Sequence, residues 1–335
     1  MVQPLRERLA TLVERVRPTV LEGWRARARA HADPRHWLSG KAASESLLDE
    51  EFLRRLERLS LFAQRSVKTG LIGEHRSVRR ANSFEFADYR HYVPGDDFRR
   101  IDWNAYGRLD QLFLKLTEAK EDVGVHLLID ASRSMDWGRP RKLHYARQVA
   151  AALGYIGLSR FDSIIAAAFS DRVHDYFAPA RGKSMALSFF GFLDGIEPDA
   201  TTDLHAAIRD YLTRTHHGGI AIVISDLLSA EGITEGLDLL TQRGFETTVI
   251  HLLDARELQP NVAGDVELYD VETGERIELT VGPESLRSYK RRLEDWFAET
   301  EAFCARRAIN YLRMDTSLPF EGLAIQYFRQ RRLVR

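Results

Sequence analysis

Short apolar segments alternate with helical patterns from residue 120 onward, and this alternation constrains the fold more than any other feature of the sequence. The segments are rich in Val, Ile, Leu and Ala and occupy residues 123–129, 163–169, 219–225, 246–253 and 309–314. Between them, apolar residues recur at helical spacing over residues 139–159, 183–194, 203–214, 232–243 and 285–307. Short buried strands that alternate with helices are typical of an α/β fold with a mostly parallel sheet and helices on both faces.

Two smaller patterns add to this sheet. Residues 173–177 predict an antiparallel edge strand beside the parallel ones. In residues 265–281, apolar and polar side chains alternate around Thr273 and Gly274, which predicts a β-hairpin. We therefore expect a hairpin insertion near residues 256–284.

The sequence divides into three regions by the spacing of its apolar residues. Residues 1–66 show apolar side chains every three or four positions, which predicts N-terminal helices. Residues 67–118 are rich in glycine, aromatic residues and paired charges, and Pro94 with Gly95 is typical of a turn, so we expect a small β-rich segment there. Residues 119–335 form the α/β domain that carries the hairpin insertion.

Composition excludes several classes of protein. The formal net charge is -1, so the chain has no overall field that would attract nucleic acid or a membrane surface. The single cysteine, Cys304, excludes an intramolecular disulfide framework, and its helical apolar surroundings indicate a core position. No apolar run reaches the roughly 18 to 20 residues of a membrane helix. We expect a soluble, cytoplasmic protein without a transmembrane segment.

Polar side chains follow the first strand at the point where it ends. The run Val125–Ile129 is followed by Asp130, Ser132 and Ser134, which are hard oxygen ligands at alternate positions. The carboxyl edge of a parallel sheet is where open α/β folds bind ligands. An Asp-x-Ser-x-Ser pattern alone is common, because these side chains also cap helices.

Two later segments supply matching oxygen atoms. The strand 219–225 is followed directly by Asp226, and Thr201 and Thr202 lie at a predicted loop-to-helix junction. Two carboxylates with several hydroxyls suit a small hard cation such as Mg²⁺, or Mn²⁺ or Ca²⁺ in its place. These few protein oxygens leave a coordination position open for an acidic side chain of a partner. The alternative is that Ser132, Ser134 and Asp226 merely cap the helices that follow.

This three-part pattern resembles the metal-ion-dependent adhesion site of von Willebrand factor A domains. The resemblance implies a von Willebrand A-like, Rossmann-like fold in which the serines and the threonine contact the cation and the aspartates act directly or through water. The positions that match are Asp130, Ser132, Ser134, Thr202 and Asp226. Those domains usually have glycine before the threonine, where this chain has Ala200 and Thr201. Either threonine could therefore face the metal, and the later Ala207 and Ile208 favour Thr202.

A second resemblance covers the flanking segments. The stretch E-F-A-D-Y-R-H-Y-V-P-G-D-D-F-R-R-I-D-W, residues 85–103, resembles the signature of the bacterial family known as domain of unknown function fifty-eight. D-A-R-E-L-Q-P and D-V-E-T-G-E resemble the same family further along, so the likeness spans about residues 70 to 333. It implies an adaptor or chaperone-like partner of MoxR-type AAA+ ATPases. Many relatives carry N-terminal membrane helices, where this chain has charged helices.

The signature residues have two interpretations. They could form a partner-binding surface made of Arg90, Asp96, Asp97, Arg99, Asp102 and Trp103. The alternative, which the sequence favours, is that Arg–carboxylate pairs and a buried indole hold the small β region against the sheet. A solvent-exposed Trp103 would favour the contact role.

The sequence therefore predicts a non-enzymatic adaptor. It would bind Mg²⁺ at the sheet edge, an acidic residue of an unknown client there, and a MoxR-type ATPase, without a small-molecule substrate. The alternative is a metal-dependent hydrolase of phosphate esters, which would need a base or further carboxylates, and only Asp136 and Asp203 lie nearby in the sequence.

Nucleic-acid binding is a third possibility. Arginines recur through the first 35 residues, but glutamates are interspersed with them, which favours a solvated helix face. We therefore expect no specific nucleic-acid partner.

Overall fold

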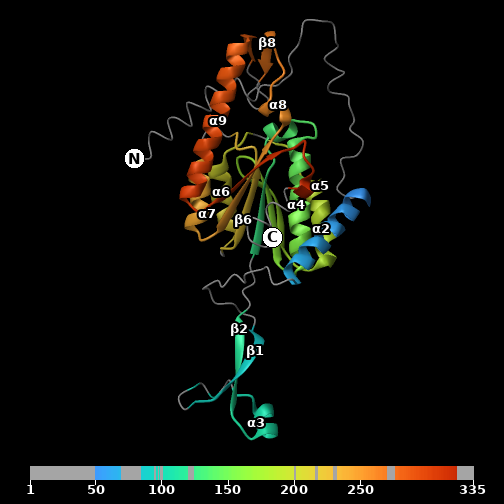
Figure 1. Cartoon of the computed structure of the whole chain (residues 1–335), viewed down its shortest axis with the longest axis vertical. Coiled ribbons are helices and arrows are strands. Elements are labelled where there is room, and N and C mark those ends of the chain that lie inside the picture. Colours follow the sequence, from blue (N-terminus) through green and yellow to red (C-terminus); the bar gives the residue numbers. More distant parts are fainter. Residues whose placement is uncertain are drawn as a thin grey trace. The chain divides into compact units, whose positions relative to one another are not determined.

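A computed structural model describes the chain over residues 50–68, 84–93, 96, 98, 101–119, 124–199, 201–215, 218–228, 232–269 and 276–322. These residues belong to two compact units. The second unit spans Gly73–Val123, and the first comprises the rest of the chain (Figure 1). Each unit is described by itself.

The first unit contains a six-stranded sheet in the order β10-β7-β6-β3-β4-β5. The strands are β3 (Gly124–Asp130), β4 (Ser163–Phe169), β5 (Val173–Ala180), β6 (Ile220–Ser225), β7 (Glu246–Leu253) and β10 (Asn310–Asp315). Every neighbouring pair is parallel except β4 and β5. The predicted mostly parallel sheet and its antiparallel edge strand are thus confirmed.

Helices cover both faces of this sheet (Figure 1). The helices of this unit are α2 (Glu50–Lys68), α4 (Lys142–Ser159), α5 (Ala186–Asp194), α6 (Leu204–Arg214), α7 (Ile233–Gln242), α8 (Ala255–Leu258) and α9 (Pro283–Arg306), and its short 3-10 turns are η3 (Arg133–Asp136) and η4 (Lys183–Met185). The predicted hairpin is also present, as β8 (Gly264–Tyr269) paired antiparallel with β9 (Arg276–Val281). The helical patterns in the sequence therefore marked real helices.

The two faces of β3 belong to different halves of the core. Leu127 and Ile129 pack in the cluster that contains α4 and α5, whereas Leu128 packs in the cluster that contains α6, α7 and α9. Successive strand residues point to opposite faces, so a strand that is buried on both faces needs an unbroken apolar run. This requirement explains why the central strands show no polar alternation.

Helix α2 is part of this core. Phe52, Leu56 and Leu59 are buried in the same cluster as α4. These residues recur at spacings of four and three and so lie on one helix face. The segment that the sequence assigned to the N-terminal helical region therefore contributes this helix to the α/β unit; the helix predicted before residue 50 lies outside the described residues.

Helix α4 packs closely on α5 at Gly154. A Cβ atom placed there would lie 2.3 Å from Cε1 of Phe189, a fully buried ring. Gly154→Ala is therefore expected to lower the free energy of unfolding by about 1–3 kcal/mol through overpacking. Urea denaturation would measure this loss.

Gly191 in α5 is the matched control. A Cβ atom there meets nothing within 4 Å. Gly191→Ala is expected to leave stability unchanged or raise it by up to about 1 kcal/mol, because alanine is the better helix former. Equal losses in both variants would contradict the packing argument.

The second unit consists of a hairpin and a short helix. Strands β1 (Phe84–His91) and β2 (Phe113–Ala119) pair antiparallel, which agrees with the predicted short strands. Helix α3 (Trp103–Leu109) lies between them in sequence and was not predicted. The Asp102 side chain begins this helix by accepting hydrogen bonds from the backbone N–H groups of Asn104 and Ala105.

Candidate cation site

Two fully buried carboxylates meet at the carboxyl edge of the sheet. Asp130 ends β3, and Asp226 follows the last residue of β6. These strands are neighbours, with Ile129 opposite Ile224, so both side chains leave the sheet at the same edge. Both aspartates have 0% of their surface exposed. The register of two parallel strands therefore brings together residues that are almost one hundred positions apart.

Hydroxyl groups surround Asp130. One of its carboxylate oxygens accepts a hydrogen bond from the backbone N–H of Ser132 at 2.9 Å, and the other accepts one from Ser225 Oγ at 2.6 Å. Ser132 Oγ and Ser134 Oγ are 3.0 Å apart. The side-chain groups that contact this carboxylate are therefore serine hydroxyls, which are hard oxygen donors.

The helix-capping alternative for these residues is wrong. Ser132 lies at the start of η3 but its side chain makes no capping hydrogen bond, and α4 begins later, after Arg141. Helix α7 begins after Gly232, so Asp226 does not cap it. These three polar side chains therefore have no role as helix caps.

The loop that carries Thr202 lies at the same edge. The backbone N–H of Asp199 donates to the carbonyl of Ala131 at 2.7 Å, and that of Asp203 donates to the carbonyl of Ser170, which follows β4. Thr202 is buried, whereas Thr201 is exposed. Of the two threonines, Thr202 is therefore the one directed toward the protein interior.

A buried lysine, which the sequence did not indicate, adjoins this edge. Lys142 Nζ donates to Asp226 Oδ2 at 2.7 Å and to Glu257 Oε1 at 2.8 Å. All three side chains are at most 2% exposed. Lysine and glutamate are rarely buried, so no single-residue pattern points to them. The Asp254-x-x-Glu257 capping spacing was the one local signal available.

The charges of this cluster perturb one another. Burial, and then repulsion from Asp226, raises the pKa of Asp130 to about 7. Burial also raises the pKa of Glu257. For Lys142 burial opposes the charged form, but Asp226 and Glu257 outweigh it and raise its pKa. Within the described residues no basic side chain pairs with Asp130, so a cation would relieve a real electrostatic cost there.

In chelator-treated protein, the raised pKa of Asp130 is expected to make stability fall as the pH rises. Between its unfolded pKa, about 4, and its folded pKa near 7, the folded state holds one more proton than the unfolded state. The free energy of unfolding therefore decreases across this range, by about 2–4 kcal/mol from this group.

Urea unfolding at several pH values in EDTA would measure the slope, with Asp130→Asn as the comparison. The asparagine variant is expected to lose this contribution. An identical slope in both proteins would assign the pH dependence to other groups.

A Ser–His–Asp grouping lies near this edge and was also missed in the sequence. Ser170 Oγ hydrogen-bonds His174 Nε2, and His174 Nδ1 lies 3.7 Å from Asp199 Oδ2. Ser170 is fully buried, however, and the distance from His174 to Asp199 exceeds a hydrogen bond. The grouping therefore lacks the reachable nucleophile and the oriented base of a hydrolase.

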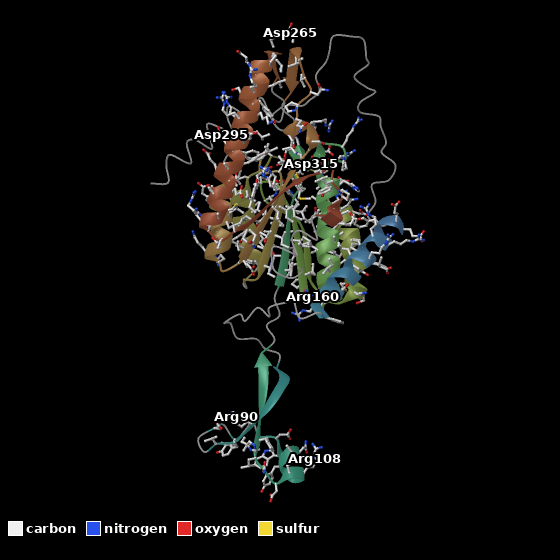
Figure 2. The ribbon with its side chains drawn as sticks, in the orientation of Figure 1. Arg90, Arg108, Arg160, Asp265, Asp295 and Asp315 are labelled. Carbon is white, nitrogen blue, oxygen red and sulfur yellow. The ribbon has the colours of Figure 1, made fainter. Side chains whose placement is uncertain are left out.

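The signature residues lie in the second unit. Arg90, which is labelled in Figure 2, pairs with Asp96 at 2.8 Å. Asp96 also accepts a hydrogen bond from the backbone N–H of Val93. Asp102 is buried as the cap of α3. Asp97 and Arg99 lie outside the described residues.

The prediction that the indole of Trp103 is buried is wrong. Trp103 is 62% exposed, because it occupies the first turn of α3 and only Ala105 of that helix is buried. Val93, Phe98, Tyr106 and Leu109 are exposed as well. The exposure of Trp103 favours the contact interpretation of the signature residues over the packing one.

The described residues contain no group of three or more His, Cys, Asp and Glu side chains that could hold a metal ion, so the candidate site depends on hydroxyls as well as carboxylates. In the same part of the chain, no helix combines the length and apolar character that crossing a membrane requires.

The fold and this edge define an α/β protein with an oxygen-rich polar cluster at the carboxyl ends of its strands. The chain belongs to the family described as "Protein of unknown function DUF58", whose model matches residues 88–296. Uncharacterized proteins of Mycobacterium bovis (Mb1516) and Mycobacterium tuberculosis (Rv1480) are each 28% identical over 245 residues, which is 70% of this chain and 75% of theirs.

The solved structures that match this chain share less sequence with it. The conserved hypothetical protein BatB from Bacteroides thetaiotaomicron is 18% identical with a TM-score of 0.39, and the match covers 62% of this chain and 98% of BatB. The pilus adhesin SpaC from Lactobacillus rhamnosus GG is 11% identical with a TM-score of 0.41, over 64% of this chain and 31% of SpaC.

Proposed function

We propose that this protein is a non-enzymatic, Mg²⁺-dependent protein-interaction module that works in the cytoplasm with a MoxR-type AAA+ ATPase and a protein client. The observation that carries the proposal is the pair of fully buried carboxylates, Asp130 and Asp226, at one sheet edge. Asp130 has no basic partner among the described residues, and hydroxyls surround it. Such hard oxygen donors fit Mg²⁺, and Mn²⁺ or Ca²⁺ less specifically.

The residues at this edge have two roles: some would hold the cation, and others orient the side chains that hold it. The side chains that would hold the cation are Asp130, Ser132, Ser134, Thr202 and Asp226. When bound, the cation supplies a Lewis-acidic position for a carboxylate of the client. Ser225 and the Ser132 backbone orient Asp130, and Lys142 and the Leu228 backbone orient Asp226.

The adaptor is favoured over a hydrolase of phosphate esters because the nearby acids are engaged elsewhere. Asp136 pairs with Arg141 at 2.9 Å, and Asp203 accepts from the backbone N–H of Ala206 at the start of α6. Asp226 accepts from the Lys142 ammonium, which makes it a poor general base. Ser170 is buried.

The exposed apolar face of the second unit supports a separate contact, which we assign to the ATPase. Trp103 and Tyr106 are packed edge to face and both are exposed. Large aromatic side chains are the residues that most often anchor protein interfaces. On this proposal the client meets the sheet edge and the ATPase meets α3.

Affinity capture from a lysate tests the two contacts together. Wild type, Asp130→Ala and Trp103→Ala would be used as baits, each with Mg²⁺ and with EDTA. Wild type is expected to retain a client only with Mg²⁺ and the ATPase in both conditions. Asp130→Ala is expected to lose the client alone, and Trp103→Ala the ATPase alone. Identical partners for all baits in both conditions would refute the metal-docking mechanism.

Turnover distinguishes the second candidate function. If wild type hydrolyses a phosphate ester with Mg²⁺ or Mn²⁺ and a folded Asp130→Ala variant does not, the protein is a metal-dependent hydrolase and not an adaptor.

A further inference from the structure

We propose that Lys142 and Glu257 set the charge of the cation that the sheet edge binds, by fixing the net charge of the buried cluster at two negative units. This inference rests on the proposed cation site. It assigns to both residues a role in selecting the ion, although neither would touch it.

The geometry places the ammonium between two carboxylates. Lys142 Nζ lies 2.7 Å from Asp226 Oδ2 and 2.8 Å from Glu257 Oε1, with no exposed surface on the lysine. Asp226 is thereby shared, with one oxygen toward Lys142 and the other toward the backbone N–H of Leu228. The lysine and Asp226 are thus one electrostatic unit with the Asp130 site.

Glu257 is held rigidly in this position. Its second oxygen accepts from the backbone N–H of Asp254 at 2.7 Å, within the capping box that begins α8. The hydroxyl of Tyr289, from α9, donates to the backbone carbonyl of Glu257. Helix α8 therefore delivers one fixed carboxylate to the ammonium.

The charges of the cluster can be counted because the cluster is closed to solvent. Three carboxylates, on Asp130, Asp226 and Glu257, and one ammonium leave two negative charges when all are ionised. His251 lies beside them, fully buried, with its Nδ1 hydrogen-bonded to the hydroxyl of Tyr311. One divalent cation balances this charge, whereas a monovalent ion leaves a surplus and a trivalent ion reverses it. Uncompensated buried charge is costly, so the balanced ion is preferred.

Two single substitutions are expected to change the preference in opposite directions. Glu257→Gln leaves one negative charge and is expected to weaken divalent binding by about tenfold or more. Lys142→Met leaves three and is expected to favour a trivalent ion over a divalent ion of similar radius by about tenfold or more. The double variant again carries two negative charges and is expected to return to the wild-type preference.

The experiment compares Ca²⁺ with Tb³⁺, which differ in charge but little in size, and adds Mg²⁺. Isothermal titration calorimetry would give the three dissociation constants for wild type, both single variants and the double variant. Glu284→Gln, an exposed glutamate in α9, is the matched control and is expected to match wild type. Where Lys142→Met alone does not fold, the Glu257→Gln and double variants still decide the question.

The outcomes separate this inference from the proposed function. Mg²⁺ binding by wild type with unchanged ion preference in the variants would overturn only the role of Lys142 and Glu257. Cation binding by Lys142→Met but not by wild type would show that the lysine replaces the metal, which overturns both. Absence of binding in every protein would likewise overturn both.

Discussion

Replacing Asp130 with alanine is expected to abolish the stabilisation of this protein by Mg²⁺. A ligand that binds only the folded state at one hundred times its dissociation constant stabilises it by about 2.7 kcal/mol. Asp130 is the fully buried carboxylate that lacks a basic partner among the described residues, so its removal takes away the main attraction for the cation. Thermal unfolding with excess Mg²⁺ and with EDTA measures the difference for each protein.

Each variant is compared with itself in Mg²⁺ and in EDTA, so the stability that the substitution itself removes cancels from the difference. Asp130→Ala also strands the Ser132 N–H and the Ser225 hydroxyl, which lowers stability in both buffers. Asp136→Ala is the matched control, since Asp136 is a nearby exposed acid paired with Arg141 at the surface. The control is expected to keep the full Mg²⁺ effect. An Mg²⁺ shift that persists in Asp130→Ala would place the cation elsewhere.

Replacing Lys142 with methionine is expected to produce the largest loss of stability in the metal-free protein. The substitution keeps the volume of the side chain but leaves Asp226 and Glu257 buried without a counter-charge. Removing one member of a buried ion pair costs about 3–5 kcal/mol. Urea denaturation in EDTA would measure the change in the free energy of unfolding.

Arg141→Met provides the control one residue away. Arg141 also forms an ion pair, but its side chain is 47% exposed, and pairs of that kind contribute about 0–1 kcal/mol. The contrast between neighbouring residues tests burial as the cause. A loss in Lys142→Met no larger than in Arg141→Met would mean that water reaches the cluster.

The sheet could be predicted from the sequence because its signal is local. β4 and β7 coincide with their apolar runs, and β3, β6 and β10 begin or end within one residue of theirs. A strand buried on both faces must be apolar throughout, and the helix that follows must be apolar on one face. These requirements are met within a few residues and leave a visible pattern.

The candidate site was only partly predictable. Asp130 and Asp226 could be found because each follows a recognisable strand, and parallel strands place their carboxyl ends together. Lys142 and Glu257 could not, since they meet across 115 residues and neither residue type is normally buried. Trp103 was expected to be buried, because an aromatic residue beside paired charges has the same appearance in a core and on a contact surface.

The sequence by itself determined the order of the strands along the chain, the apolar layers and the oxygen-bearing residues at the strand ends. The tertiary structure alone decided which charges face one another. A buried ammonium between Asp226 and Glu257 is stable only because three separate elements converge on it and exclude water. Electrostatic energy depends on the distance between charges and on their burial, and neither quantity can be read from the amino-acid sequence.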